Sequence, residues 1–292
     1  SFHATGGDFE RSDAGCAICH THQGFLERLP TNAYSTAARI DDPAPPNCRT
    51  CHLIHTTYTS ADYALRATTP ITLYQGGQVV DLGSEAGNLC GRCHQSRILS
   101  PMPAIGGPNI TLSSSSATRY GGHHSPVAQI ISGEGLFEFS GSATIAGGAF
   151  THGDPDYNPG VCAGCHMAEA YGAQAGGHTL QMGYDLHGSE VENVAGCNAV
   201  GCHKTVEDFD HWNVRPEIKG LLSDLSAELY RLGIKADADP TSVSAKSGSF
   251  PGDVAAAFVN YQLITEDKSG GLHNPPYVRN VLKNTIAKMK TY

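Results

Sequence analysis

Four short stretches of the chain share the pattern C-x-x-C-H: Cys16-Ala-Ile-Cys19-His20, Cys48-Arg-Thr-Cys51-His52, Cys90-Gly-Arg-Cys93-His94 and Cys162-Ala-Gly-Cys165-His166. A shuffled chain of this composition would contain about 0.02 such matches by chance. Two cysteines three positions apart lie on one turn, where their thiols can form thioethers with the two vinyl groups of one haem, and the adjacent histidine then lies under the iron. The pattern predicts covalently attached c-type haems.

A fifth stretch, Cys197-Asn-Ala-Val-Gly-Cys202-His203, keeps the two cysteines and the histidine but has two more residues between the cysteines. A bulged loop can absorb these residues, so we interpret the stretch as a fifth site. The prediction is therefore five haem c groups, held by ten thioether cysteines and five proximal histidines. These residues are Cys16, Cys19, Cys48, Cys51, Cys90, Cys93, Cys162, Cys165, Cys197 and Cys202, with His20, His52, His94, His166 and His203.

Zinc sites and disulfides are the alternatives to haem. Zinc sites built from cysteine alone use two cysteine pairs each, so five pairs would leave one pair unused. Zinc also gives no reason for a histidine after every second cysteine. Disulfides would account for the ten cysteines but not for the five histidines.

The sixth ligand of each iron is expected to be histidine. Ten histidines lie outside the motifs, and the chain has only four methionines, which could replace histidine and raise the potential. Met167 directly follows a motif histidine and cannot reach the opposite face of that haem, Met182 and Met289 fit ordinary packing, and Met102 lies in a proline-rich loop. Ligation by two histidines predicts low potentials and no open position on the iron.

The context of each spare histidine suggests its role. His55 lies three residues after His52, badly placed for the same iron, so it would serve a neighbouring haem. His123 and His178 follow glycine pairs that let the backbone approach a flat macrocycle closely. His152 shortly precedes the fourth motif, and His273 precedes a predicted helix start. We predict these five as distal ligands, with His22, His124 and His187 as alternatives; His3 and His211 are the remaining spare histidines.

Composition and charge exclude some classes of function. The formal net charge is -9, and the 19 lysines and arginines are mostly dispersed, so no nucleic-acid partner is expected. No stretch approaches the roughly 20 apolar residues that would cross a bilayer. Haem c is attached outside the cytoplasm, and the chain begins at Ser1 without a leader, so we expect an exported protein whose signal has been removed.

The expected fold is a mostly irregular, loop-rich multihaem cytochrome with a few α-helices, chiefly in the C-terminal quarter. The 34 glycines make a large side-chain core unexpected, so a stack of haems would fill the interior. We expect one domain over residues 1–292: haems 1 to 3 in sequence order over 1–100, haem-wrapping loops and haems 4 and 5 over 101–215, and a helical part over 216–292. Helices are predicted from Pro216 to Gly233, Asp253 to Asp267 and Pro275 to Lys290.

Several segments resemble a module of multihaem cytochromes in metal-respiring bacteria. They are Asn88-Leu-Cys-Gly-Arg-Cys-His-Gln-Ser-Arg97, Arg119-Tyr-Gly-Gly-His-His-Ser-Pro126, Thr151-His152, Cys162-Ala-Gly-Cys-His-Met167, Gly177-His-Thr-Leu180 and Leu272-His-Asn-Pro275. The resemblance implies that His123 or His124, with His123 preferred, and His152, His178 and His273 are distal ligands.

The N-terminal part, with Cys19-His-Thr-His22 and Cys51-His-Leu-Ile-His55, resembles extracellular cytochromes that polymerise into haem-stacked filaments, often called cytochrome nanowires. In such filaments a histidine of one subunit can ligate a haem of the next, and His3, His22 and His55 are the positions that could do so here. The resemblance implies copies of the chain itself, and redox partners or extracellular electron acceptors, as partners.

The expected function is electron transfer through five haems, in an extracellular or cell-surface filament. A discrete periplasmic shuttle would use the same chemistry and differ only in assembly. A multihaem reductase of a small oxyanion would need an iron with an open position and a cationic pocket, and the sequence shows neither. We therefore expect an electron-transfer protein and not an enzyme.

Overall fold

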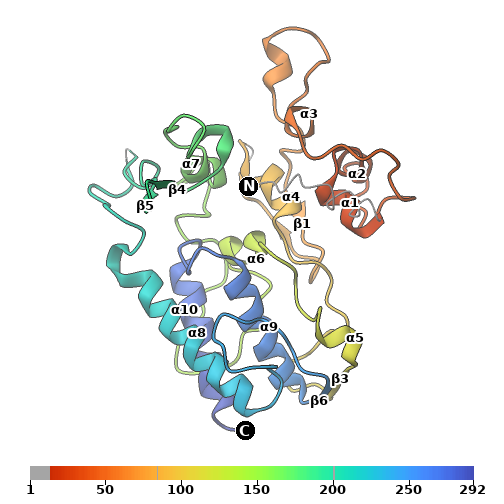
Figure 1. Cartoon of the computed structure of the whole chain (residues 1–292), viewed down its shortest axis with the longest axis vertical. Coiled ribbons are helices and arrows are strands. Elements are labelled where there is room, and N and C mark those ends of the chain that lie inside the picture. The colour runs from red at the N-terminus through yellow and green to blue at the C-terminus, as the bar shows by residue number, and fades with distance from the viewer. Residues whose placement is uncertain (1–13, 84, 200) are drawn as a thin grey trace.

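The computed structural model describes residues 14–83, 85–199 and 201–292. Figure 1 shows the long C-terminal helices α8, α9 and α10 gathered at one end of the molecule, in its lower half. The short helices α1, α2, α3, α4 and α7 lie in the upper half, joined by loops. The chain therefore places its longest helices on one side and its cysteine motifs on the other.

The elements are mostly short. The α-helices are α1 (Ala14–His20), α2 (His22–Arg28), α3 (Cys48–Cys51), α4 (Gly87–Cys93), α5 (Ser114–Ala117), α6 (Val127–Ser132), α7 (Cys162–His166), α8 (Val214–Arg231), α9 (Gly252–Glu266) and α10 (Pro275–Met289). The 3-10 helices are η2 (Ser60–Tyr63), η3 (Gly177–Thr179) and η4 (His211–Asn213). The strands form antiparallel pairs: β1 (Ile71–Thr72) with β2 (Val79–Val80), β3 (Ile110–Leu112) with β6 (Gly248–Phe250), and β4 (Gly183–Leu186) with β5 (Ser189–Glu192).

The three helices predicted for the C-terminal quarter are present, within two residues of their predicted ends. α8 buries Ile218, Leu225 and Leu229 on one face, as their helical spacing predicts. The chain turns after α8 at Gly233, whose φ of +77° is the left-handed conformation that glycine adopts readily. Within the described residues, no helix has the length and apolarity that crossing a bilayer requires.

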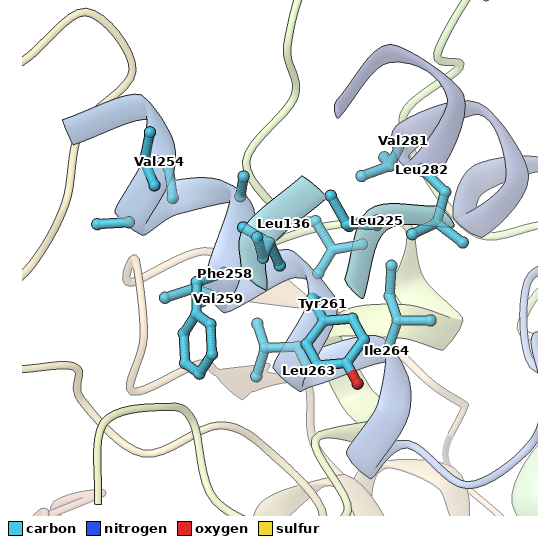
Figure 2. Packing of buried hydrophobic residues seen from close by; sticks show 14 of the residues in the cluster. Leu136, Leu225, Val254, Phe258, Val259, Tyr261, Leu263, Ile264, Val281 and Leu282 are labelled. Carbon is cyan, nitrogen blue, oxygen red and sulfur yellow. The ribbon is translucent and has the colours of Figure 1, made fainter. Parts of the chain in front are cut away.

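The C-terminal helices enclose a side-chain core, contrary to our expectation. α9 is buried almost all round, and Figure 2 shows Phe258 and Leu263 of this helix in one cluster with Leu225 of α8 and Leu282 of α10. Each large apolar side chain buried in this way contributes about 1.5–3 kcal/mol to the hydrophobic stabilisation. The glycine count misled because only one of the 34 glycines, Gly252, lies in α9 or α10.

The stretch from residue 101 to 160 also differs from its prediction as haem-wrapping loop. β3 pairs with β6, with Ile110 opposite Phe250, and the helix α6 is buried. Much of the stretch therefore packs on α9 and α10, through Ile110, Leu112, Ala117, Tyr120, Ile130, Leu136 and Phe139. A strand pair between residues so far apart in sequence leaves no local periodicity, which is why the sequence did not reveal it.

Glu217 in the first turn of α8 connects this helix to α10. Arg279 Nε donates to Glu217 Oε2 at 2.7 Å, and Lys283 Nζ lies 3.4 Å from Oε1. Partial burial opposes ionisation, but the two cations outweigh it and hold the pKa of Glu217 below its usual value. Because the folded pKa is depressed, this stabilisation is present above the unfolded pKa of about 4.3 and is lost as pH falls through the folded value.

We expect Glu217→Gln to lower the free energy of unfolding by about 0.5 to 1 kcal/mol at pH 7, since partly exposed ion pairs contribute this much. The difference from wild type should disappear at pH values below the folded pKa. Denaturant titrations followed by circular dichroism at both pH values measure it, with Glu207→Gln at an exposed carboxylate as control. A difference that persists at low pH would contradict the ion-pair explanation.

Candidate haem sites

The cysteine motifs form compact turns, and in three of them the amide of the motif histidine closes the turn by a hydrogen bond. Four of the motifs lie on the short helices α1, α3, α4 and α7. The amide of His52 donates to the carbonyl oxygen of Cys48 at 2.9 Å, and that of His94 donates to Cys90 at 3.0 Å. In the fifth motif the amide of His203 donates to the carbonyl oxygen of Cys197 at 3.0 Å, so the longer loop keeps this closure. None of the ten cysteines forms a disulfide.

Four motif histidines each face a histidine from a distant part of the chain. The ring centres are 6.1 Å apart for His20 and His123, 6.2 Å for His52 and His178, 6.2 Å for His203 and His152, and 6.4 Å for His166 and His273. A metal bonded to one nitrogen of each ring at about 2 Å requires ring centres about 6 Å apart. The spacing therefore fits an iron held between two imidazoles.

The arrangement supplies pairs of ligands. In the part of the chain that the structure describes, no group of three or more histidine, cysteine, aspartate or glutamate side chains is placed to hold a metal ion. Two axial imidazoles are what a haem iron takes from a protein, because the macrocycle supplies its other four nitrogens. The pairs fit haem in this respect.

Hydrogen bonds donated by Nδ1 orient several of these rings. The Nδ1 atoms of His52, His166 and His152 lie 2.7, 3.0 and 2.6 Å from the backbone carbonyl oxygens of Tyr63, Leu180 and Leu272. The Nδ1 atom of His273 meets a side-chain carboxylate oxygen instead, Asp267 Oδ1, at 2.7 Å. A proton on Nδ1 that is donated to oxygen leaves the Nε2 lone pair available for a metal.

Two short segments each serve two neighbouring pairs. Residues 178–180 supply the ring of His178 to His52 and the carbonyl oxygen of Leu180 to His166. Residues 272 and 273 supply the carbonyl oxygen of Leu272 to His152 and the ring of His273 to His166. The pairs of the second, fourth and fifth motifs are thereby linked through the backbone.

The glycine pairs before His123 and His178 contact protein. A Cβ atom on Gly122 would lie 2.3 Å from Leu263 Cδ2 of α9, and one on Gly176 would lie 2.2 Å from the carbonyl oxygen of Glu169. These glycines permit close packing of the backbone on other segments, where we had expected close approach to a macrocycle. His123 itself has a φ of +83°, an uncommon conformation for a residue other than glycine, and such outliers cluster at functional sites.

The other spare histidines occupy different surroundings. His22 Nδ1 lies 2.9 Å from Thr50 Oγ1, and His124 forms an ion pair with Glu266. The exposed ring of His55 stacks on Tyr58, and the ring centre of His211 lies 4.9 Å from that of His203. His187 lies in the turn between β4 and β5, and His3 is outside the described residues. The described ring contacts give His94 no histidine partner.

The spatial order of the motifs differs from their order in the sequence. We had expected haems 1 to 3 to lie in sequence order. α4 contacts both α1 and α7, and the thiol of Cys19 lies beside that of Cys93, as that of Cys90 lies beside that of Cys162. Burial raises the pKa of Cys165 to about 11, with smaller contributions from the thiols of the fifth motif. The third motif therefore lies between the first and the fourth, and the fifth lies beside the fourth.

Arg28 joins the first and third motifs. Its guanidinium is buried, donates to the carbonyl oxygen of Arg92 at 2.6 Å and to Tyr74 Oη at 2.8 Å, and lies 3.6 Å from Cys19 Sγ. A hydrogen bond with Cys93 and the charge of Arg28 together lower the pKa of the Cys19 thiol to about 7. Arginine is suited to this position because its planar group donates in several directions at once.

Burial also acts on the imidazoles. Among the motif histidines and their partners, burial is the largest cause that lowers the pKa of His94, His123, His166 and His203, and it so favours the neutral form that binds metals. His273 is different, because burial opposes its charged form but the carboxylate of Asp267 outweighs it and raises the pKa of the ring.

Sequence reasoning missed the residues that orient the rings. Backbone carbonyl oxygens carry no side-chain signal, so Tyr63, Leu180 and Leu272 could not be identified. Arg28 lies outside the first motif, eight residues after His20, and belongs to no recognisable pattern. Its role depends on contacts with Tyr74 and Arg92, which are distant in sequence. Asp267 ends a predicted helix with a negative charge, which is unfavourable there and could have been noticed.

Comparison with known proteins supports the fold. No family profile matches the chain, and no curated protein matches it. The crystal structure of outer cell wall cytochrome OcwA is similar, with a TM-score of 0.52 and 19% sequence identity, over 97% of this chain and 47% of that one. The chain thus spans about half the length of that cytochrome. At this identity the likeness concerns the fold, and the predicted loop-rich cytochrome fold is confirmed.

We expect Arg28→Met to lower the free energy of unfolding by about 2 to 4 kcal/mol, because the carbonyl oxygen of Arg92 and the hydroxyl of Tyr74 would lose a buried donor. Chemical denaturation of the purified protein measures the change. Arg49→Met is the matched control: Arg49 is exposed within the second motif, and its replacement should change stability by less than about 0.5 kcal/mol. Equal effects of the two substitutions would contradict the role assigned to Arg28.

Proposed function

We propose that the chain binds five haem c groups and transfers electrons through them. The observation that carries the proposal is the set of four ring pairs, each joining a motif histidine to a predicted distal histidine at 6.1 to 6.4 Å. The likeness of the fold to that of a cytochrome agrees with it. When bound, haem supplies a one-electron couple of its iron, and the protein contributes spacing, ligation and a low dielectric.

The proposed ligand sets follow from the pairs. The two cysteines of each motif would hold the macrocycle through thioethers, and the iron would be held by His20 with His123, His52 with His178, His166 with His273, and His203 with His152. His94 is the proximal ligand of the third haem. Because two histidines would hold each of these four irons, the sites favour electron transfer over the binding of a substrate.

The contacts between motifs provide a route for electrons. The third motif meets the first through Cys19 and Cys93 and meets the fourth through Cys90 and Cys162. The fourth and fifth are linked again by the segment of Leu272 and His273. A continuous series of neighbouring sites of this kind is what a conduit through a single folded unit requires.

We propose that the third site is completed by His55 of a second copy of the chain, in a filament. In Figure 1 the segment around α3 and the loop that follows it project from the top of the molecule. His55 is exposed on this loop beside Tyr58, which is 82% exposed, and Tyr63 is 73% exposed. Exposed aromatic side chains of this kind are typical anchors of protein interfaces.

Asp62 makes this loop rigid. Its carboxylate is buried and accepts hydrogen bonds from the amides of Thr56, Thr57 and Tyr58 at 2.7 to 3.1 Å. A loop held in this way loses little conformational entropy when it docks, so it can present His55 to another chain at low cost. The partners of the protein would then be copies of itself and redox partners or extracellular acceptors.

Export to the cell surface or beyond is part of the proposal, because haem c is attached outside the cytoplasm and the similar structure is that of an outer cell wall cytochrome. A periplasmic location is the alternative. The proposal includes no nucleic-acid partner, in keeping with the net charge of -9.

A reductase is the second candidate, and His94 is the observation that favours it. If no second chain supplied a ligand opposite His94, the third iron would have an open position at which a small oxyanion could bind. Such an enzyme would show a high-spin haem in its assembled state and would bind nitrite there. A filament with low-spin haems throughout would exclude this candidate.

We expect His178→Ala to convert one of the haems from low spin to high spin, because the ring that faces His52 is removed. Mass spectrometry should still find five haems, since the cysteines are intact, and electron paramagnetic resonance of the oxidised protein measures the spin states. His187→Ala, at the nearby β4–β5 turn, is the control and should leave the spectrum unchanged. A His178→Ala protein with the wild-type spectrum would contradict the pairing.

We expect His55→Ala to abolish filaments in electron micrographs and to produce one high-spin haem per chain. The wild-type protein should form filaments in which all haems are low spin. Ser60→Ala changes an exposed residue of the same loop and should leave filaments intact. Wild-type protein that stays dispersed at high concentration would contradict polymerisation, and His55→Ala filaments with low-spin haems would contradict the role of His55.

A further inference from the structure

Among the described contacts of the paired rings, the one between His273 and Asp267 is made to a carboxylate. The Nδ1 atoms of His52, His152, His166 and His123 lie near backbone carbonyl oxygens, at 2.6 to 3.3 Å. His273 Nδ1 lies 2.7 Å from Asp267 Oδ1, so this ring donates to a charged oxygen. Hydrogen bonds to charged acceptors are about twice as strong as those between neutral groups.

The carboxylate of Asp267 is shielded from water. Its side chain is 1% exposed, and that of His273 is 20% exposed. Its second oxygen, Oδ2, accepts a hydrogen bond from the hydroxyl of Ser269. A charge buried to this degree is screened little by solvent or salt, so it acts at nearly full strength on the groups beside it.

Asp267 is poorly placed for the stability of its own helix. It is the C-cap of α9, where the helix dipole is negative and cations are favoured, and α9 has no basic residue in its last turn. The preceding residue, Glu266, is also buried and pairs with His124. Two acidic residues at this end of a helix are therefore explained by the histidines that they face.

We propose that Asp267 lowers the reduction potential of the haem bound between His166 and His273. This inference rests on the proposed haem ligation and deepens it. A carboxylate that accepts the Nδ1 proton makes the imidazole a stronger electron donor to iron, and its negative charge favours the more positive, oxidised iron. On reduction the iron gains one electron, and the proton stays in the hydrogen bond between Nδ1 and Oδ1, so no bond is broken.

The consequence concerns the route of electrons. The fourth motif contacts the third and lies beside the fifth, so its haem is an inner member of the series. A lower reduction potential makes this haem harder to reduce than the haems on either side of it. Electrons would then reside on the neighbouring haems, and this haem would be reduced only transiently as they pass.

The test is a redox titration, followed optically, of the complete haem-loaded protein and its variants. Asp267→Asn keeps the shape of the side chain and an oxygen that can accept from Nδ1, but removes the charge. We expect the reduction potential of one haem, that of the His166 and His273 pair, to rise. Its reduction equilibrium should shift at least tenfold, which is about 59 mV for one electron. Asp253→Asn is the matched control, because Asp253 is a buried carboxylate of the same helix and contacts Lys288 and Tyr292. It should leave the reduction potential of every haem unchanged.

Two further variants keep the outcome decisive. Ser269→Ala removes the hydroxyl that offsets part of the charge on Asp267 and should lower the reduction potential of the same haem. His273→Ala identifies that haem, because it should convert the haem of this pair to high spin. If His273→Ala leaves every haem low spin, the haem assignment itself is wrong. If it removes one low-spin haem while Asp267→Asn and Ser269→Ala leave that potential unchanged, the role of Asp267 alone is overturned.

Discussion

The facing of two imidazole rings across about 6 Å is the constraint on which the rest of this structure depends. One ring of each pair is held by a cysteine motif, and the other arrives from a segment far away in the sequence, as with His52 and His178 or His166 and His273. Short helices and hydrogen-bonded loops can satisfy this constraint because each ring needs only a fixed backbone turn and one acceptor for Nδ1. Long elements are needed where side chains alone form the core.

The C-terminal end of α9 anchors several of these segments to that core. The side chain of Gln262 accepts from the amide of Gly122 at 2.9 Å, just before His123, and the carbonyl oxygen of Glu266 accepts from Ser125 at 3.0 Å, just after it. Asp267 then contacts His273. The C-terminal end of this buried helix thus positions His123 and His273, the rings that face the first and the fourth motif.

The sequence was most informative where chemistry is encoded by adjacent residues. The attachment motifs and the three long helices could be predicted, because spacing of two cysteines and a histidine, or of leucines along a helix, is a local property. The partners that the structure brings to four motif histidines are those that context and resemblance suggested. The spatial order of the motifs could not be predicted, since the contact of Cys19 with Cys93 depends on tertiary packing through Arg28. The strand pair of Ile110 and Phe250 was missed for the same reason.

The central claim is that iron lies between the paired rings. Anomalous diffraction from crystals of the haem-loaded protein, measured above and below the iron absorption edge, locates the iron atoms directly. The account predicts one iron midway between the rings of each of the four pairs and a fifth beside His94. Iron at other positions, or no iron between His166 and His273 or the other paired rings, would contradict it.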